Sequence, residues 1–262
     1  MIRHLRLFIY FLRFSFSKAM QFRIDFFFRI GMDIVFYLVN ILFYQVIYSH
    51  TDLIGGWTSE QMMIFIGGFL VVDALSMTFF SNNLIAISLF VNRGDLDYYL
   101  IRPVSSLFFL SLRDFAANSF VNLLMAIGIL IAAFIRYSGP IPPPLLLLYL
   151  VLILNGTYLR YLVRMLTIIP VFWLHQSRGL EMMFFHLARF LERPDTIFTG
   201  PVRLILTTIL PFGLMVSFPA RFLFDGFQWN LLLHIIAVTI ALTIVVLYFW
   251  HRGLRAYSSA SS

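Results

Sequence analysis

The sequence predicts an all-α membrane protein with six transmembrane helices and an amphipathic, interfacial helix at its N-terminus. Three observations support this fold class. Of the 262 residues, 61% are hydrophobic and 12% are charged, whereas soluble domains carry about 25% charged residues. Several apolar segments reach about 20 residues, the length needed to cross a bilayer. Because lipid offers the backbone no hydrogen-bond partners, such segments must be helical.

Residues 1–24 predict a helix that lies in the membrane interface. Polar residues recur there at steps of three and four and form one stripe: Arg3, Arg6, Tyr10, Arg13, Ser17 and Gln21. Phenylalanine and leucine dominate the remaining surface. An interfacial helix needs this division, because its apolar side enters the acyl boundary while its arginines meet anionic headgroups.

Six apolar segments predict the membrane-spanning helices. They cover residues of about 26–48, 60–90, 107–135, 145–174, 202–224 and 231–250. The second is longer than the bilayer requires, so its last turns are expected to protrude. Pro211 and Pro219 interrupt the fifth. With no internal repeat and no long extramembranous segment, residues 1–262 are expected to form a single transmembrane domain.

Residues 178–193 predict a second amphipathic helix, which we place at the cytoplasmic surface between the fourth and fifth spans. Its apolar face consists of Leu180, Met183, Phe184, Leu187, Phe190 and Leu191. Its polar face consists of Arg178, Glu181, His186, Arg189, Glu192 and Arg193. This division between faces is typical of a helix at the membrane surface.

Lysine and arginine are distributed unevenly between the two sides of the predicted bundle. With a cytoplasmic N-terminus, fourteen lie on the cytoplasmic side and two, Arg136 and Arg221, on the other. Positive residues are retained in the cytoplasm, so both termini are expected to be cytoplasmic. Because the basic residues are spread between spans, we attribute the net charge of +7 to topology and lipid contact. No nucleic-acid partner is expected.

Sequence patterns for catalysis are absent. A phosphate-binding loop needs glycines followed by lysine, but the only lysine, Lys18, lies in the interfacial segment. The chain has no cysteine, and its six histidines lack metal-ligand spacing. The chain is therefore expected to bind no metal or cofactor and not to be an enzyme.

Several polar residues fall inside the predicted spans, where each costs free energy unless it faces protein or water. They are Asp73 and Asn83 in the second span, Asp114, Asn118 and Asn122 in the third, and Arg160 and Arg164 in the fourth. The three in the third span are spaced as one continuous stripe. Two interpretations stay open: a polar translocation path or moving charge-paired interface, and static helix contacts in which a carboxylate neutralises an arginine.

The connection over residues 91–106 predicts a short docking helix. Gly94 ends the second span, Asp95 is a candidate N-cap and Pro103 stops the helix. Leu96, Tyr99 and Leu100 are expected to form its apolar face. A short, capped, aromatic helix of this kind suits a groove in another protein.

Two segments carry a family resemblance. Gly94-Asp95-Leu96-Asp97, followed by Leu100-Ile101-Arg102-Pro103-Val104, resembles the signature after the second span in bacterial ABC-2-type permease subunits. A second stretch resembles the family around the fifth span: Arg193-Pro194, Ile197-Phe198, Arg203, Ile209-Leu210-Pro211-Phe212 and Pro219-Ala220. Arg193 stands where the family has an aromatic residue. The resemblance covers nearly the whole chain.

The resemblance implies a membrane subunit of an exporter in the bacterial inner membrane. Such a subunit dimerises with itself or a sibling and binds two copies of a cytoplasmic ATPase, which holds ATP and magnesium. The coupling helix that seats in the ATPase would comprise Gly94, Asp95, Leu96, Asp97, Leu100, Arg102 and Pro103. Residues 1–24 would form an elbow helix, and Pro211 and Pro219 would belong to an outward gate.

The main alternative is an ion-coupled secondary transporter. Asp73 or Asp114 would then serve as its proton site, with broken helices near the membrane midplane. The absence of an internal repeat and the small size favour the ATP-driven exporter instead.

Overall fold

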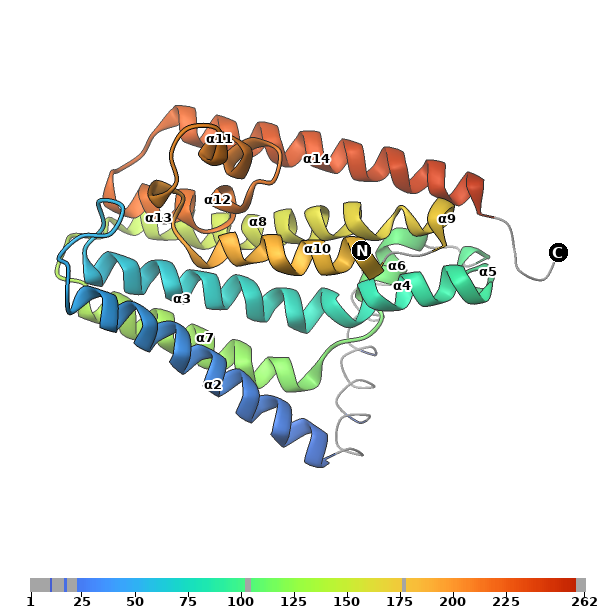
Figure 1. Cartoon of the computed structure of the whole chain (residues 1–262), viewed down its shortest axis with the longest axis horizontal. Coiled ribbons are helices and arrows are strands. Elements are labelled where there is room, and N and C mark those ends of the chain that lie inside the picture. Colours follow the sequence, from blue (N-terminus) through green and yellow to red (C-terminus); the bar gives the residue numbers. More distant parts are fainter. Residues whose placement is uncertain (1–9, 11–16, 18–22, 102–104, 176–177, 258–262) are drawn as a thin grey trace.

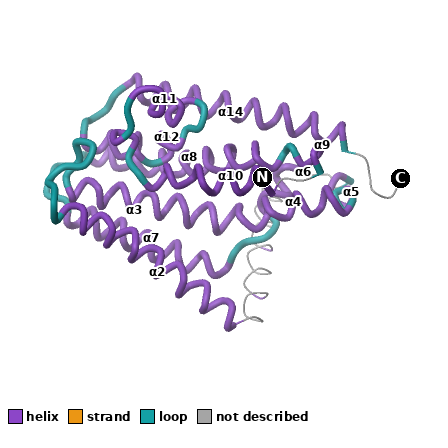
Figure 2. Tube along the Cα trace, viewed as in Figure 1, coloured by secondary structure: helices purple, strands orange, loops and turns teal. Residues whose placement is uncertain are grey.

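The structure, a computed structural model, describes residues 23–101, 105–175 and 178–257, together with Tyr10 and Ser17. This part of the chain is helical and contains no strand (Figure 2). Five of its helices are long and apolar enough to cross a membrane: Phe26–Tyr48, Ser59–Arg93, Ala117–Arg136, Pro143–Leu174 and Trp229–Ala256 (Figure 1). The interfacial helix predicted for residues 1–24 lies almost entirely outside the described residues, and so do Arg102 and Pro103.

The second span occupies the centre of the bundle. It consists of α3 (Ser59–Ser76), a π-helical turn (Met77–Ser81) and α4 (Asn82–Arg93). Thr58 and Gln61 form a capping box that starts α3. Gly94, with φ of 77°, ends α4 in a left-handed conformation that favours glycine, as predicted. The first span, α2 (Arg23–Tyr48), packs against α3.

The third span is not one helix, so the prediction for residues 107–135 is wrong in this respect. It divides into α6 (Ser106–Leu112) and α7 (Ala117–Arg136). Residues 113–116 between them are not helical. The backbone N–H of Ala116 donates to the carbonyl oxygen of Thr78 in the π-helical turn, at 3.1 Å. The two irregular segments therefore lie side by side.

The fourth span starts at a proline-rich turn, as predicted. It consists of α8 (Pro143–Ile168) and α9 (Val171–Leu174). Proline is tolerated in the first turn of a helix, because the N–H it lacks would have no partner there. A hydrogen bond from the Asn155 side chain of α8 to the Thr239 hydroxyl, at 3.1 Å, joins α8 to the last span, α14 (Trp229–Ala256).

The fifth span, predicted over residues 202–224 with interruptions at Pro211 and Pro219, is divided further than expected. The chain forms three short helices there: α11 (Gly200–Thr208), α12 (Phe212–Met215) and α13 (Ser217–Phe224). Pro211 separates the first two and is the N-cap of α12. Pro219 does not break α13, because it lies in the first turn of that helix.

These three helices form a hairpin that enters the bundle and returns. Its midpoint touches α8, where a β-carbon on Gly156 would overlap the carbonyl group of Met215. Its last residue, Phe224, packs edge-on against Trp57 and at a tilt against Tyr137, with ring centroids 5.6 and 5.7 Å away. We call the end of the bundle formed by residues 49–58, 137–142 and 225–228 the loop end.

The segment before the hairpin is helical as predicted, in α10 (Arg178–Ala188) and the 3₁₀ turn η2 (Arg189–Glu192). We predicted this helix at the cytoplasmic surface between the fourth and fifth spans, whereas it packs lengthwise on the bundle. Figure 1 shows α10 running along α8, and η2 contacts α3. At its start the Ser88 hydroxyl donates to the Glu181 carboxylate, at 3.3 Å. At its end Tyr44, near the loop end of α2, donates to the Glu192 carbonyl oxygen, at 2.8 Å.

Candidate functional site

A buried ion pair joins two of the polar residues found in the sequence. Arg160 of α8 and Asp73 of α3 lie 2.5 Å apart, and their side chains are 14% and 16% exposed. At 1.5 Å per residue, Asp73 lies about 21 Å along α3 from Ser59, which is well inside a hydrocarbon layer about 30 Å thick. Of the pairings left open by the sequence, Asp73 with Arg160 is the one that forms.

Arg164, one turn further along α8, is also buried. Its guanidinium donates to the Ser81 hydroxyl at 2.7 Å. It also lies over the rings of Phe184 and Phe185, at 6.0 and 5.5 Å from their centroids. Such cation–π contacts are strongest where water is excluded. Arg164 therefore connects α8 with both the π-helical turn and α10.

Asp33 of α2 was missed in the sequence analysis. Together with Asn122, Asp73, Arg160 and Arg164 it forms what we call the polar layer. It accepts a hydrogen bond from the Asn122 side chain of α7. Tyr37 donates to the Asn122 backbone oxygen at 3.4 Å. The available signal was that Asp33 is the only carboxylate within an apolar run of 23 residues, and an intramembrane carboxylate usually has a partner.

The stripe predicted for the third span is broken. Asn118 and Asn122 lie on α7, half-buried and buried respectively, but Asp114 lies in the non-helical segment before that helix. The side chain of Asn83 instead pairs with the Asp114 backbone. It donates to the carbonyl oxygen at 2.7 Å and accepts from the N–H at 2.9 Å. One amide thus replaces the helical hydrogen bonds that the break removes.

Replacing Asn83 with leucine tests this connection. The Asp114 N–H and carbonyl groups would lose the partners that Asn83 provides, at about 1–3 kcal/mol for each buried group. The matched control is Asn155→Leu, which removes a half-buried contact between two side chains of α8 and α14. We expect Asn83→Leu to lower the free energy of unfolding in mixed micelles clearly more than the control. Equal losses would contradict a special role for Asn83.

The predicted docking helix is present as α5 (Asp97–Leu100). Its apolar face differs from the prediction, because Leu96 is fully buried and Tyr99 packs inward. Tyr99 accepts a hydrogen bond from Arg113, whose guanidinium lies 5.0 Å from the centre of the Tyr99 ring. The side chains that α5 presents outward are Tyr98, Leu100 and Ile101, which are 68%, 37% and 82% exposed. The predicted cap is also wrong, because Leu96 rather than Asp95 is the N-cap.

The end of α14 lies against this docking segment. The ring of Tyr257 packs against Phe172, with centroids 6.3 Å apart. Burial raises the pKa of the Tyr257 hydroxyl, and the nearby carboxylates of Asp97 and Asp95 add to the rise. The C-terminal end of the last span and the docking helix therefore share one end of the bundle, opposite the loop end (Figure 1).

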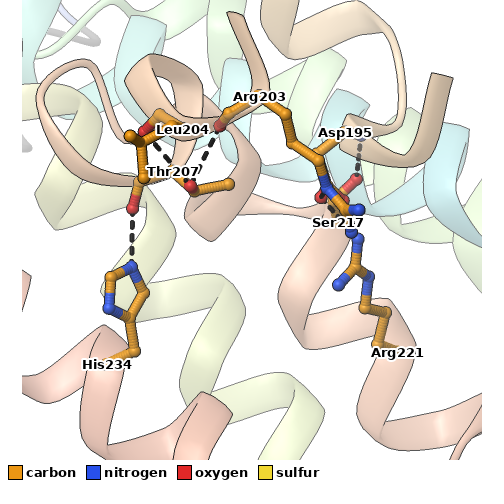
Figure 3. Close-up of polar contacts among 7 residues, drawn as sticks. All are labelled: Asp195, Arg203, Leu204, Thr207, Ser217, Arg221 and His234. Carbon is orange, nitrogen blue, oxygen red and sulfur yellow. Dashed lines mark hydrogen bonds and ion pairs between the residues drawn. The ribbon is translucent and has the colours of Figure 1, made fainter. Parts of the chain in front are cut away.

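A second charged cluster closes the hairpin (Figure 3). Asp195 is 1% exposed and accepts hydrogen bonds from Arg203, at 3.1 Å, and from Arg221. Its backbone N–H donates to the Ser217 hydroxyl at 2.9 Å. Arg203 counts among the fourteen basic residues predicted on the cytoplasmic side and Arg221 among the two on the other side; this separation is wrong, because both bind one carboxylate. Asp195 therefore ties together the two arms of the hairpin.

The hairpin is also tied to the last span. His234 of α14 donates from Nε2 to the carbonyl oxygen of Thr207 at 2.7 Å (Figure 3). The Thr207 hydroxyl in turn donates to the backbone of Arg203, at 2.9 Å. Among the described residues, no group of histidines and carboxylates could hold a metal ion. The polar layer and the hairpin therefore place paired charges inside an otherwise apolar bundle.

Comparison with known proteins agrees with this architecture. The family model for ABC-2 family transporter proteins matches residues 34–261, which is most of the chain. No curated protein and no solved structure matches the chain. The match covers the bundle, the docking helix and the hairpin together. This chain is therefore a multi-pass membrane permease that belongs to the ABC-2 transporter family.

Proposed function

We propose that this chain is the membrane subunit of an ATP-driven exporter whose ATPase is a separate cytoplasmic protein. The observation that carries the proposal is the exposed turn of Tyr98, Leu100 and Ile101 at the end of the bundle. Large apolar side chains outside the spans have neither lipid nor core to cover them. They fit a groove on another protein. ATP and magnesium would bind that partner, since no phosphate loop exists in this sequence.

Six membrane crossings follow if α10 and η2 count as one. These two helices run from the end of the bundle that carries α5, where Glu181 contacts Ser88, to the loop end, where Thr196 lies against Gly55. The hairpin would then enter from the loop end without crossing. Both termini would be cytoplasmic, in line with the arginines at the two ends of the sequence. The protein would lie in the bacterial inner membrane.

Contacts of α5 provide a route by which its movement would reach the polar layer. Tyr99 holds Arg113, and the next residue, Asp114, is bonded to Asn83 beside the π-helical turn. That turn ends at Ser81, which contacts Arg164. Because π turns often mark functional sites in helices, we propose that this junction bends when the ATPases close.

The path itself would lie between two copies of this chain, or between this chain and a sibling. The hairpin would form the outward gate, since residues 211–220 fill the loop end of the bundle and are all buried. Pro211 and Pro219 would belong to this gate, as the resemblance implies. Lipids would surround the outer faces of α2 and α14, whose exposed side chains are mostly apolar.

Changes on α5 test the docking proposal. We expect Ile101→Asp combined with Tyr98→Ala to abolish co-purification with the ATPase while the chain stays folded, because both side chains are exposed. In contrast, Leu96→Ala should lower the stability of the chain itself by about 2–5 kcal/mol, as expected for a buried leucine. Size-exclusion profiles separate the two effects. Unchanged ATPase retention in the double variant would refute docking through α5.

The alternative, an ion-coupled secondary transporter, finds no specific support. Asp73 is held by Arg160, and Asp114 lies outside the spanning helix.

A further inference from the structure

The exposed side of α10 and η2 carries a stripe of positive and apolar side chains. The stripe consists of Arg178, Met182, Phe185, His186 and Arg189, which are spaced at helical intervals, and of Arg193, which follows η2 in an extended conformation; all six are exposed. The opposite side, with Phe184 and Leu191, is buried. The exposed face of α14 differs from this stripe, because it is apolar over most of its length: Leu233, Ile236, Ile240, Ile244 and Leu247.

The stripe runs between the two ends of the bundle. Near the start of α10, Glu181 accepts a hydrogen bond from Ser88 of α4. At the end of η2, the Glu192 carbonyl oxygen accepts from Tyr44, which is about 6 Å from the end of α2 at 1.5 Å per residue. In the proposed topology α10 and η2 form one of the six crossings, so Arg189 lies within the bilayer. Arginines there usually face water or protein rather than hydrocarbon.

The charge of the stripe indicates which molecules can occupy the space in front of it. Among the described residues, no carboxylate lies within ion-pair distance of Arg189 or Arg193, although both guanidinium groups act electrostatically on the Glu192 carboxylate. Glu181 and Glu192 are half-buried on the inner side. A second copy related by two-fold symmetry would present the same stripe, and like charges brought together are unfavourable. The space between two copies would thus be positively charged and lined by Met182 and Phe185, which are 56% and 52% exposed.

We propose that this stripe binds an amphiphile with an anionic phosphate or carboxylate headgroup, and that such amphiphiles are the exported substrates. The arginine forks would hold the headgroup with charge-assisted hydrogen bonds. Methionine and phenylalanine would cover part of the acyl chain, since methionine adapts to varied shapes. The substrate assignment and the pairing of two copies rest on the proposed transport function, whereas the anionic site itself is argued from the exposed stripe.

The test measures the thermal stability of the full chain in a neutral detergent, together with its co-expressed ATPase. Dodecyl phosphate, dodecylphosphocholine and inorganic phosphate are compared as additives. We expect dodecyl phosphate to raise Tm more than the other two. In Arg189→Gln/Arg193→Gln, about tenfold or more dodecyl phosphate should be needed for the same rise. The control, Arg252→Gln/Arg255→Gln, removes two exposed arginines of α14 and should respond like the unchanged chain.

Equal effects of the three additives, or a full response in the Arg189→Gln/Arg193→Gln variant, would overturn the inference. Retention of the ATPase in the same samples keeps this outcome separate from failure of the proposed function. Selective stabilisation without any bound ATPase would support the anionic site and contradict the ATP-driven exporter. A bound ATPase without selectivity would overturn the inference alone.

Discussion

Replacing Asp195 with alanine is expected to cause one of the largest losses of stability of any single change in this chain. The substitution would leave Arg203 and Arg221 beside each other without the carboxylate that neutralises them. Arg221 is 12% exposed, so water cannot replace the lost partner. Breaking a buried pair in this way costs about 3–5 kcal/mol. The measurement is unfolding in mixed micelles, followed by tryptophan fluorescence.

Two further variants show whether charge is the cause. Asp195→Asn keeps the size of the side chain but not its charge, so we expect a loss nearly as large as that in Asp195→Ala. Arg203→Gln should cost only about 0–1 kcal/mol, because its side chain is 44% exposed. The central role of Asp195 in holding the hairpin would be refuted if Asp195→Ala cost no more than Arg203→Gln.

Breaking the pair of Asp73 and Arg160 is expected to have a comparable effect. Each single change, Asp73→Leu or Arg160→Leu, leaves one charge buried among α3 and α8 and should cost about 3–5 kcal/mol. The double variant removes both charges, and leucines of adequate volume can then pack together. We expect it to recover most of the lost stability, because replacing a buried pair with apolar residues is often neutral or favourable.

The same double variant separates the two interpretations that the sequence left open. ATP hydrolysis by the complex should stay close to that of the unchanged complex if the pair is a static contact. It should fall if the pair must rearrange during transport. A double variant as unstable as the single ones would contradict the prediction, since it would show that the pair contributes more than its mutual neutralisation.

The helices with clear start and stop signals could be predicted from the sequence. Gly94 ends α4 where expected, and Pro143 lies in the first turn of α8. The break at residues 113–116 could not be predicted, because it contains neither glycine nor proline. It depends on Asn83, 31 positions earlier in the chain, which satisfies the exposed backbone groups.

The segment from 178 to 224 was misplaced for a related reason. Hydropathy measures length and apolarity, so an apolar hairpin over 200–224 resembles a span of the same length. It also assigns an amphipathic segment such as α10 to the membrane surface, although here α10 packs along α8 and its Glu181 meets Ser88 of α4. Asp195 gave no signal, because its partners lie 8 and 26 residues away and depend on how the hairpin folds.

The most direct test of ATP-driven transport is the composition of the purified complex. The chain would be co-expressed with the phosphate-loop ATPase encoded nearest to its gene, extracted in mild detergent and weighed by native mass spectrometry. The predicted result is an assembly of two membrane subunits and two ATPase subunits, which Ile101→Asp with Tyr98→Ala reduces to the membrane subunits. A chain that keeps its fold but never retains the ATPase would contradict the proposed function.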